Sequence, residues 1–404
     1  EALEAARQAA EQTHATPEDP IAQAADALRQ ATLFRIGLGE EDRALGNAQK
    51  FARFFGNDAQ RRRDVANVVF SIGQIYADRV ARLKRQSGDR NEREREIRSA
   101  WGEVVRHYSS YMRTYANQGT VDQQIQGAVA LGRGYWNQGD TRQATTYFQQ
   151  AVTAWGTSSG EGQPSSGERR IREQLGDAAG DAVEKSKDAV AEAKFYLAEL
   201  LYNRFMGARL PAYSGGGNRR SFDTWTTRQL TPYVTARRAT LEEATTKYRE
   251  VIELHVPNWE IAAFARLADM FHQFARTIRE APVAPDIQRN ADLLDAYNVL
   301  RDETTQPFIE NAKAGFQRCI QRSTAVHWFN EWSQLCERSL NVIDRLNFPL
   351  ADEVRVEPNL VFSRANNARP VYSLQTSTET EEEGDSRPDT SDQQTTGTPA
   401  ARPQ

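Results

Sequence analysis

One stretch of the sequence, residues 128–151, has the pattern of two short helices joined by a tight turn. It reads AVALGRGYWNQGDTRQATTYFQQA, with apolar residues at helical spacing on both sides of a Gly-Asp pair. Gly132 and Ala144 are small enough to let two helix backbones approach closely, and Tyr135 and Phe148 are large enough to fill the space around that contact. The stretch therefore predicts a helical hairpin that is centred on Gly132 and Ala144.

Both halves of this pattern recur along the chain. The second-helix half is an alanine, an aromatic residue four positions later and a small residue three positions after that; it starts at Ala144, Ala244 and Ala312. The first-helix half starts at Val69, Ala128, Phe264 and Trp332, and more loosely at Lys194. Several such halves in alternation predict stacked helical hairpins, that is, an all-α solenoid.

The spacing A-x2-L-G-x2-Y, followed by A-x3-F, resembles the tetratricopeptide (TPR) repeat, with Ala128 where that repeat usually carries Trp. The resemblance extends over roughly residues 20–345, but insertions separate the repeat halves, so the usual period of about 34 residues is not kept. It implies a TPR-like solenoid that holds partner peptides along the concave face built by its first helices.

The expected organisation follows from shifts in composition along the chain. Gly- and Ser-rich stretches predict flexible insertions, and a C-terminal stretch of Ser, Thr, Glu, Asp, Gln and Pro cannot bury enough apolar area to repay its ordering. The predicted parts are N-terminal helices forming a degenerate repeat (1–60), TPR-like hairpins (61–155), a flexible insertion (156–187) that includes a polar helix, further hairpins (188–345) with an insertion at 203–231, an extended segment (346–362) and a disordered tail (363–404).

The Arg-heavy, insertion-rich form is similar to large TPR proteins of myxobacteria and related deltaproteobacteria. The ending carries most of that likeness: ENAKAGFQRCIQRS, a Trp-rich helix and then LNFPLADEVRVEPN. The group includes envelope proteins tied to adventurous gliding motility and to type IV pilus assembly. The resemblance implies a scaffold or adaptor in a multiprotein assembly of the cell envelope or periplasm; the alternative is a cytoplasmic TPR adaptor or chaperone-like peptide binder. The chain starts with Glu1 rather than Met, as expected of a fragment or of a form from which a signal peptide has been removed.

The composition argues against several other classes of function. A formal net charge of −4 over 404 residues gives no bulk attraction to nucleic acid, and no apolar run reaches the roughly 18 residues of a membrane span. The sequence contains no GxGxxG, GxxxxGK, HExxH or CxxC motif. We therefore expect no enzymatic activity, cofactor, metal or small-molecule substrate; an enzyme built on a TPR-like framework is the alternative.

Histidine and cysteine are the residues most suited to site chemistry in this chain. His255 and His272 lie on adjacent predicted helices, but two imidazoles without a third ligand favour ordinary packing over a metal site. Cys319 and Cys336 lie 17 residues apart on consecutive predicted helices and face neighbouring helices. They are interpreted either as two buried thiols or as a disulfide, and no base for a catalytic thiol is identifiable.

The remaining candidate for function is the surface of the first helices. Next to the repeat positions, that face is expected to present Phe70, Gln74, Arg133, Trp136, Tyr202, Asp269 and His272. Aromatic residues with Arg are typical of protein interfaces, so these residues form the predicted partner-binding groove; packing beneath the insertions is the alternative for several of them. The Lys/Asn/Arg clamp that some TPR domains use for C-terminal carboxylates is not visible.

Overall fold

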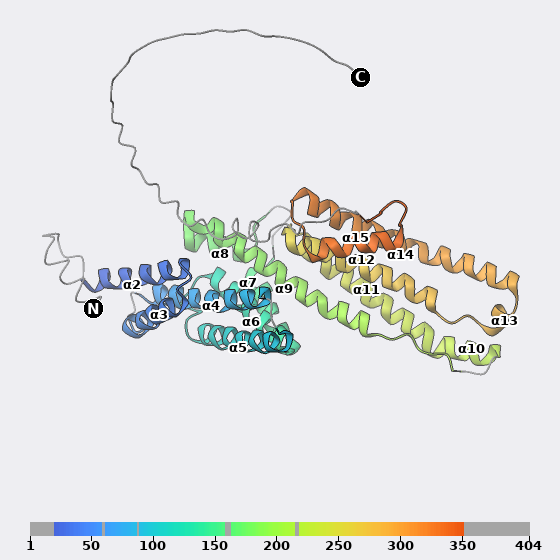
Figure 1. Ribbon diagram of the computed structural model, residues 1–404, viewed down its shortest axis with the longest axis horizontal. Helices are drawn as coiled ribbons and strands as arrows, with labels where there is room; N and C mark the ends of the chain where they lie inside the picture. The colour runs from blue at the N-terminus through green and yellow to red at the C-terminus, as the bar shows by residue number, and fades with distance from the viewer. Residues whose placement is uncertain (1–19, 59–60, 87–88, 158–162, 215–217, 351–404) are drawn as a thin grey trace, which may run out of the picture. The chain divides into compact units, whose positions relative to one another are not determined.

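The computed structural model describes residues 20–58, 61–86, 89–157, 163–214 and 218–350. Every secondary-structure element in these ranges is a helix, and no strand occurs among them (Figure 1). The prediction of an all-α fold made of helical hairpins is confirmed. The predicted tail at 363–404, most of the extended segment at 346–362 and the first part of the N-terminal helices lie outside the described residues.

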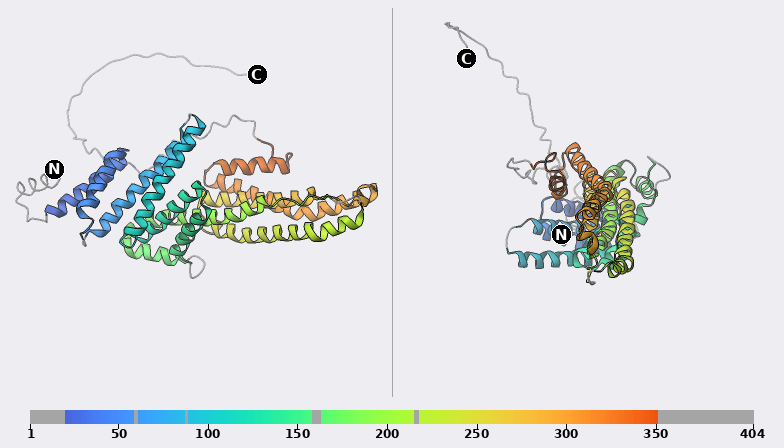
Figure 2. Two further views of the ribbon diagram at one scale, coloured as in Figure 1. Left: turned by 90° about the horizontal axis from the view of Figure 1, so that it is seen from below. Right: turned by 90° about the vertical axis from the view of Figure 1, so that its right-hand side faces the viewer.

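Consecutive helices pair as hairpins in chain order (Figures 1 and 2). The pairs are α2 (Pro20–Gly37) with α3 (Glu41–Phe55), α4 (Arg62–Arg85) with α5 (Arg90–Thr114), α6 (Val121–Gln138) with α7 (Thr141–Trp155), α9 (Ala179–Gly207) with α11 (Thr231–Ile252), and α12 (Pro257–Glu280) with α14 (Ala291–Ala325). The additional elements are α8 (Ser166–Leu175), the 3-10 turn η1 (Gly176–Ala178), α10 (Arg219–Trp225), the π-helical segment η2 (Thr226–Leu230), α13 (Pro285–Gln288) and the last helix, α15 (Glu331–Ile343).

The contacts between hairpins are made on one side by their first helices. Helix α4 contacts α6, α6 contacts α9, α9 contacts α12, and α12 contacts α15, whereas the second helices α5, α7, α11 and α14 do not contact one another within the described chain. Each second helix instead packs on the first helix of the following hairpin, as α7 does on α9. The first helices α4, α6, α9 and α12 therefore form a continuous surface, which we call the first-helix face.

Four of the five hairpins in the described ranges, from α4 onward, are each held by an aromatic ring placed against a small residue. A Cβ atom added to Gly132 on α6 would lie 2.5 Å from the ring of Phe148 on α7, and one added to Gly73 on α4 would lie 2.3 Å from the ring of Tyr108 on α5. In the two later hairpins, alanines at the corresponding position share buried clusters with the aromatic residues Tyr248 and Phe316. The contact predicted at Gly132 is confirmed, because only a hydrogen atom fits beneath the Phe148 ring.

The turn between α6 and α7 has the chemistry expected from its sequence. Gly139 ends α6 in the left-handed conformation with φ of 86°, which costs glycine little because it has no Cβ atom. The Asp140 carboxylate then accepts a hydrogen bond of 3.0 Å from the backbone N–H of Gln143 and caps α7.

Within the two expected insertions, at 156–187 and 203–231, the structure describes α8, η1 and the start of α9 in the first, and the end of α9, α10 and η2 in the second. In the first, Ile171 on α8 and Val183 on α9 are buried in the core cluster of α6 and α7. In the second, α9 continues to Gly207, and α10, η2 and α11 run on from Arg219 without interruption. The apolar side chains in these stretches are sparse but fall at helical spacing, so they bury against neighbouring helices.

Cys319 on α14 and Cys336 on α15 form a disulfide, and both side chains are fully buried. Of the two alternatives left open by the sequence, the structure therefore contains the disulfide. It connects the last helix covalently to the preceding hairpin. No helix within the described ranges is long and apolar enough to cross a membrane.

Candidate partner-binding face

The structure places four of the seven predicted surface residues in one network on the first-helix face: Arg133, Trp136, Tyr202 and Asp269. Phe70 does not belong to this surface. It is 5% exposed, and its ring packs against Tyr108 and Tyr111 of α5, because its position on α4 faces the partner helix of the hairpin. Gln74 and His272 are half-buried on α4 and α12. Phe70 is therefore removed from the candidate groove.

Arg133 on α6 forms an ion pair with Glu192 on α9 through two nitrogen atoms of its guanidinium group. Glu192 is only 3% exposed, whereas the Arg133 side chain remains 37% exposed. Burial alone would lower the pKa of Arg133, but the charge and hydrogen bonds of Glu192 outweigh this effect and raise it. The pair therefore fixes α6 against α9 while leaving one side of the guanidinium group accessible.

A second buried carboxylate makes the corresponding connection between α9 and α12. Glu199 accepts hydrogen bonds of 2.8 and 3.1 Å from Arg266 and one of 2.7 Å from the hydroxyl group of Tyr248. The Arg266 guanidinium carbon lies 4.2 Å from the ring centroid of Tyr202 and 4.6 Å from that of Trp332 on α15. Its positive charge is thus held by a carboxylate and two aromatic faces.

Beside this ion pair, a further hydrogen bond joins α9 to α12. The Tyr202 hydroxyl group donates 2.7 Å to Asp269, and burial together with this bond raises the pKa of Tyr202. Both residues were predicted to be available to a partner. They lie on the first-helix face, but their polar atoms are already engaged with each other.

A row of aromatic rings crosses the face between these two ion pairs. Trp136 of α6 lies 5.1 Å from Tyr196 of α9, and Tyr196 lies 6.1 Å from Trp259 of α12, measured between ring centroids. All three side chains are half-buried. The row therefore exposes ring surface from three successive first helices.

Asp188 lies at the edge of this row. Its carboxylate is exposed and accepts a hydrogen bond of 3.2 Å from the indole N–H of Trp259. Protein atoms crowd its other sides, and this desolvation, with the negative charge of Glu192, raises the pKa of Asp188 to about 6 despite the opposing charge of Arg133. Arg133 gives its hydrogen bonds to Glu192, so Asp188 has no ion-pair partner among the described residues.

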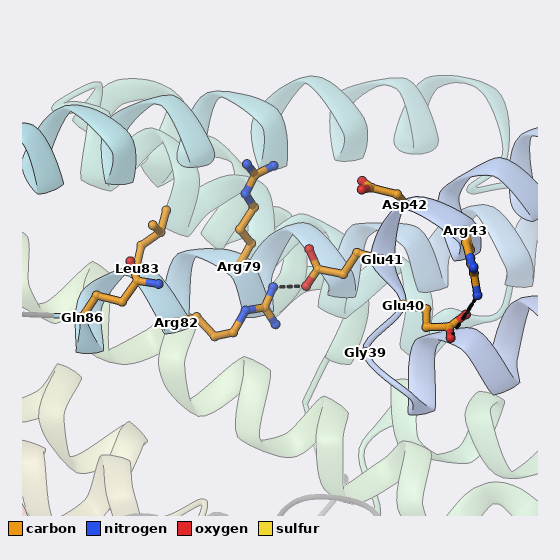
Figure 3. Close-up of a pocket in the computed structure, with 9 residues that line it drawn as sticks. All are labelled: Gly39, Glu40, Glu41, Asp42, Arg43, Arg79, Arg82, Leu83 and Gln86. Atoms are coloured by element: carbon orange, nitrogen blue, oxygen red, sulfur yellow. Dashed lines mark hydrogen bonds and ion pairs between the residues drawn. The ribbon is translucent and has the colours of Figure 1, made fainter.

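A depression in the described surface forms a separate site between the start of α3 and the end of α4. It has a volume of about 850 Å³ and is lined mainly by charged residues of the ranges 39–43 and 79–86 (Figure 3). Arg82 pairs with Glu41, and Arg43 pairs with Glu40 at 3.2 Å. Because its charges largely neutralise one another and Leu83 is its only large apolar side chain, it does not resemble a ligand pocket lined mainly by apolar groups.

A smaller groove of about 300 Å³ is lined by residues of α11, α12 and α14. Phe271 of α12, Phe308 of α14 and Leu241 of α11 give it an apolar lining, and Arg238 and Arg249 flank it. Its lining includes no nucleophile paired with a base. The described residues also contain no group of three His, Cys, Asp or Glu side chains placed to hold a metal ion.

Sequence reasoning missed the acidic members of the first-helix face. Asp188, Glu192 and Glu199 occupy positions i, i+4 and i+11 of α9, on the same side as the buried Phe195. Acidic residues in a core-facing stripe require basic partners on neighbouring helices, because an unpaired buried charge is costly. This spacing was the available signal for a buried ion-pair network.

The fold and this face define an all-α solenoid of stacked helical hairpins with a polar, aromatic surface along its first helices. Neither a model of a known protein family nor a curated protein matches the chain.

Proposed function

We propose that this chain is a non-enzymatic TPR-type scaffold that binds a partner protein along its first-helix face. The observation that carries the proposal is the row of Trp136, Tyr196 and Trp259, which presents half-buried rings from three successive first helices. Large aromatic side chains fixed by a rigid support tend to supply most of the free energy of protein association. The two ion pairs on either side supply that support.

Site-specific photocrosslinking in the organism that makes the protein tests this proposal. Asn137 is exposed on α6 next to Trp136, and Gln149 is exposed on the second helix α7 of the same hairpin. A photoreactive amino acid at position 137 is expected to capture a discrete partner, and one at position 149 is the matched control. Capture from position 149 alone would place the binding surface on the second helices and overturn the proposal.

The variant that probes this face must leave the ion pairs intact. Truncating Arg133 would leave the carboxylate of Glu192 buried without its partner, so a loss of binding would be mixed with a loss of stability. Trp136→Ala with Trp259→Ala removes ring surface without removing a charge. We expect this double variant to lose the crosslink at position 137 while its helical content, measured by circular dichroism, is kept.

We further propose that the scaffold works in the cell envelope, in the periplasm, as part of a multiprotein machine such as one for gliding motility or type IV pili. The Cys319–Cys336 disulfide supports an oxidising compartment, because such bonds are rare in cytosolic proteins. The ending of the sequence supports the motility assignment by its resemblance to envelope TPR proteins. Fractionation of the tagged protein tests the compartment, and loss of surface motility in a deletion strain tests the machine; a cytoplasmic protein in cells of normal motility would overturn both.

A further inference from the structure

The groups that hold the positive charge of Arg266 have a partial counterpart elsewhere on the first-helix face. Around Arg266 these groups are the carboxylate of Glu199 and the rings of Tyr202 and Trp332. Lys84 provides a simpler example, since its ammonium group lies 5.5 Å from the ring centroid of Trp101. Aromatic faces thus hold basic side chains at more than one place in this chain, on the first-helix face at Arg266 and against Trp101 of α5 at Lys84.

The second set consists of the carboxylate of Asp188 and the rings of Tyr196 and Trp259, which we call the Asp188 site. Trp259 donates its indole N–H to Asp188, and Tyr196 lies between Trp259 and Trp136. These groups parallel Glu199, Tyr202 and Trp332, but no basic side chain of the described chain pairs with Asp188.

We propose that the Asp188 site binds a basic side chain, preferably arginine, from the partner segment that lies on the first-helix face. This inference rests on the scaffold function proposed above and specifies the chemistry of the partner. An arginine is favoured over a lysine because its planar guanidinium group stacks on aromatic rings while it pairs with a carboxylate.

The local charges favour this occupant over a metal ion. The carboxylate of Glu192 is already engaged by Arg133, so Asp188, which accepts a hydrogen bond from Trp259, is the carboxylate of the two that has no ion-pair partner among the described residues. Hard metal ions need several oxygen ligands at once, whereas a guanidinium group needs one carboxylate and a flat apolar surface. Binding of a cation would also relieve the repulsion between Asp188 and Glu192 that, with desolvation, raises the pKa of Asp188.

The test uses two short capped peptides, acetyl-Gly-Arg-Gly-amide and a norleucine analogue that lacks the guanidinium group, titrated into the full chain. The indole N–H signals of the seven tryptophans report binding by NMR, and a Trp259→Phe variant assigns the relevant signal. The arginine peptide is expected to shift the Trp259 signal, and the norleucine peptide is not. In Asp188→Asn the affinity for the arginine peptide should fall at least about tenfold, as expected on loss of an opposite charge.

Asp181→Asn is the matched control, since Asp181 lies exposed near the start of the same helix and pairs with Lys185 instead. Equal affinity of the two peptides, an unchanged affinity in Asp188→Asn or no shift of the Trp259 signal would each overturn the proposal. The photocrosslink at position 137 separates this result from the scaffold function. A partner captured there by both the parent and Asp188→Asn with equal yield leaves the scaffold intact and refutes recognition through Asp188.

Discussion

Arg133 and Glu192 form an ion pair in which the acidic partner is buried and the basic partner is half-exposed. The pair joins α6 to α9 and therefore one hairpin to the next. Its free-energy contribution depends on which side chain is removed, because Glu192 cannot regain solvent where it lies. This asymmetry leads to the first prediction.

Arg133→Ala should lower the free energy of unfolding by about 3 kcal/mol, because it leaves a buried carboxylate without a partner. The double variant Arg133→Leu with Glu192→Leu should be nearly as stable as the parent, since removing both charges abolishes the desolvation cost. Urea unfolding of the parent, single and double variants measures both values. If the double variant is as unstable as the single one, the ion pair contributes packing rather than charge compensation.

Gly132→Ala should destabilise the protein by about 1–3 kcal/mol, because the added methyl group overlaps the Phe148 ring in a packed core. Gly46 provides a matched control: it lies within α3, and a Cβ atom added there meets no atom within 4 Å. Gly46→Ala should stabilise the helix by up to about 1 kcal/mol, because alanine is the better helix former. Effects of the same sign in thermal melts of the two variants would contradict this account.

Replacing both Cys319 and Cys336 by Ala should lower the free energy of unfolding by about 3 kcal/mol, the value expected for a crosslink that closes a loop of this length. Peptide mapping without reductant should first recover residues 319 and 336 in one crosslinked peptide. Denaturant melts of the parent and the double variant then give the difference. Free thiols in the purified parent protein would contradict the disulfide.

Stability should depend on pH through Asp188. Its folded-state pKa is raised from 3.8 to about 6, so the folded state favours the protonated carboxyl, and this contribution is complete below about pH 4 and is lost as the pH rises through about 6. Asp188→Asn removes the charge that faces Glu192 on α9 and Arg133 on α6. The variant should melt at a higher temperature than the parent at pH 7, and the difference should shrink on acidification towards pH 4. Melting curves of the parent, Asp188→Asn and the control Asp181→Asn measure this dependence; a constant difference would contradict the assignment.

The hairpins could be predicted because their central contact is local in sequence. A small residue such as Gly132 and an aromatic residue such as Phe148 occur at fixed positions in the two helices that meet, so the pattern itself encodes the pairing. Helix α5 does not match the second-helix pattern, because Val104 stands where the other second helices have alanine, four positions before Tyr108. The burial of α8 and of the start of α9 could not be predicted, because their few apolar side chains become informative only beside the helices that they contact.

The candidate site was predictable only in part, because several of its contacts join residues that lie far apart in the sequence. Arg133 and Trp136 follow directly from their places beside the repeat positions. Asp188 and Trp259 are 71 residues apart in the chain, and they meet because α9 and α12 lie in one particular register. That register is set by tertiary packing, including the Glu199–Arg266 pair, and no short pattern in the sequence encodes it.

The disulfide between α14 and α15 also determines the order in which such a chain comes apart. Stacked hairpins contact only their neighbours, so local opening starts where a hairpin has the fewest restraints. At α15 a covalent bond prevents the last helix from separating, whereas α2 and α3 are held by a small cluster and leave Phe34 and Phe54 exposed. Backbone amides should therefore exchange with solvent faster in α2 and α3 than in α14 and α15, and thermal fraying should advance in one direction through the hairpins towards the disulfide.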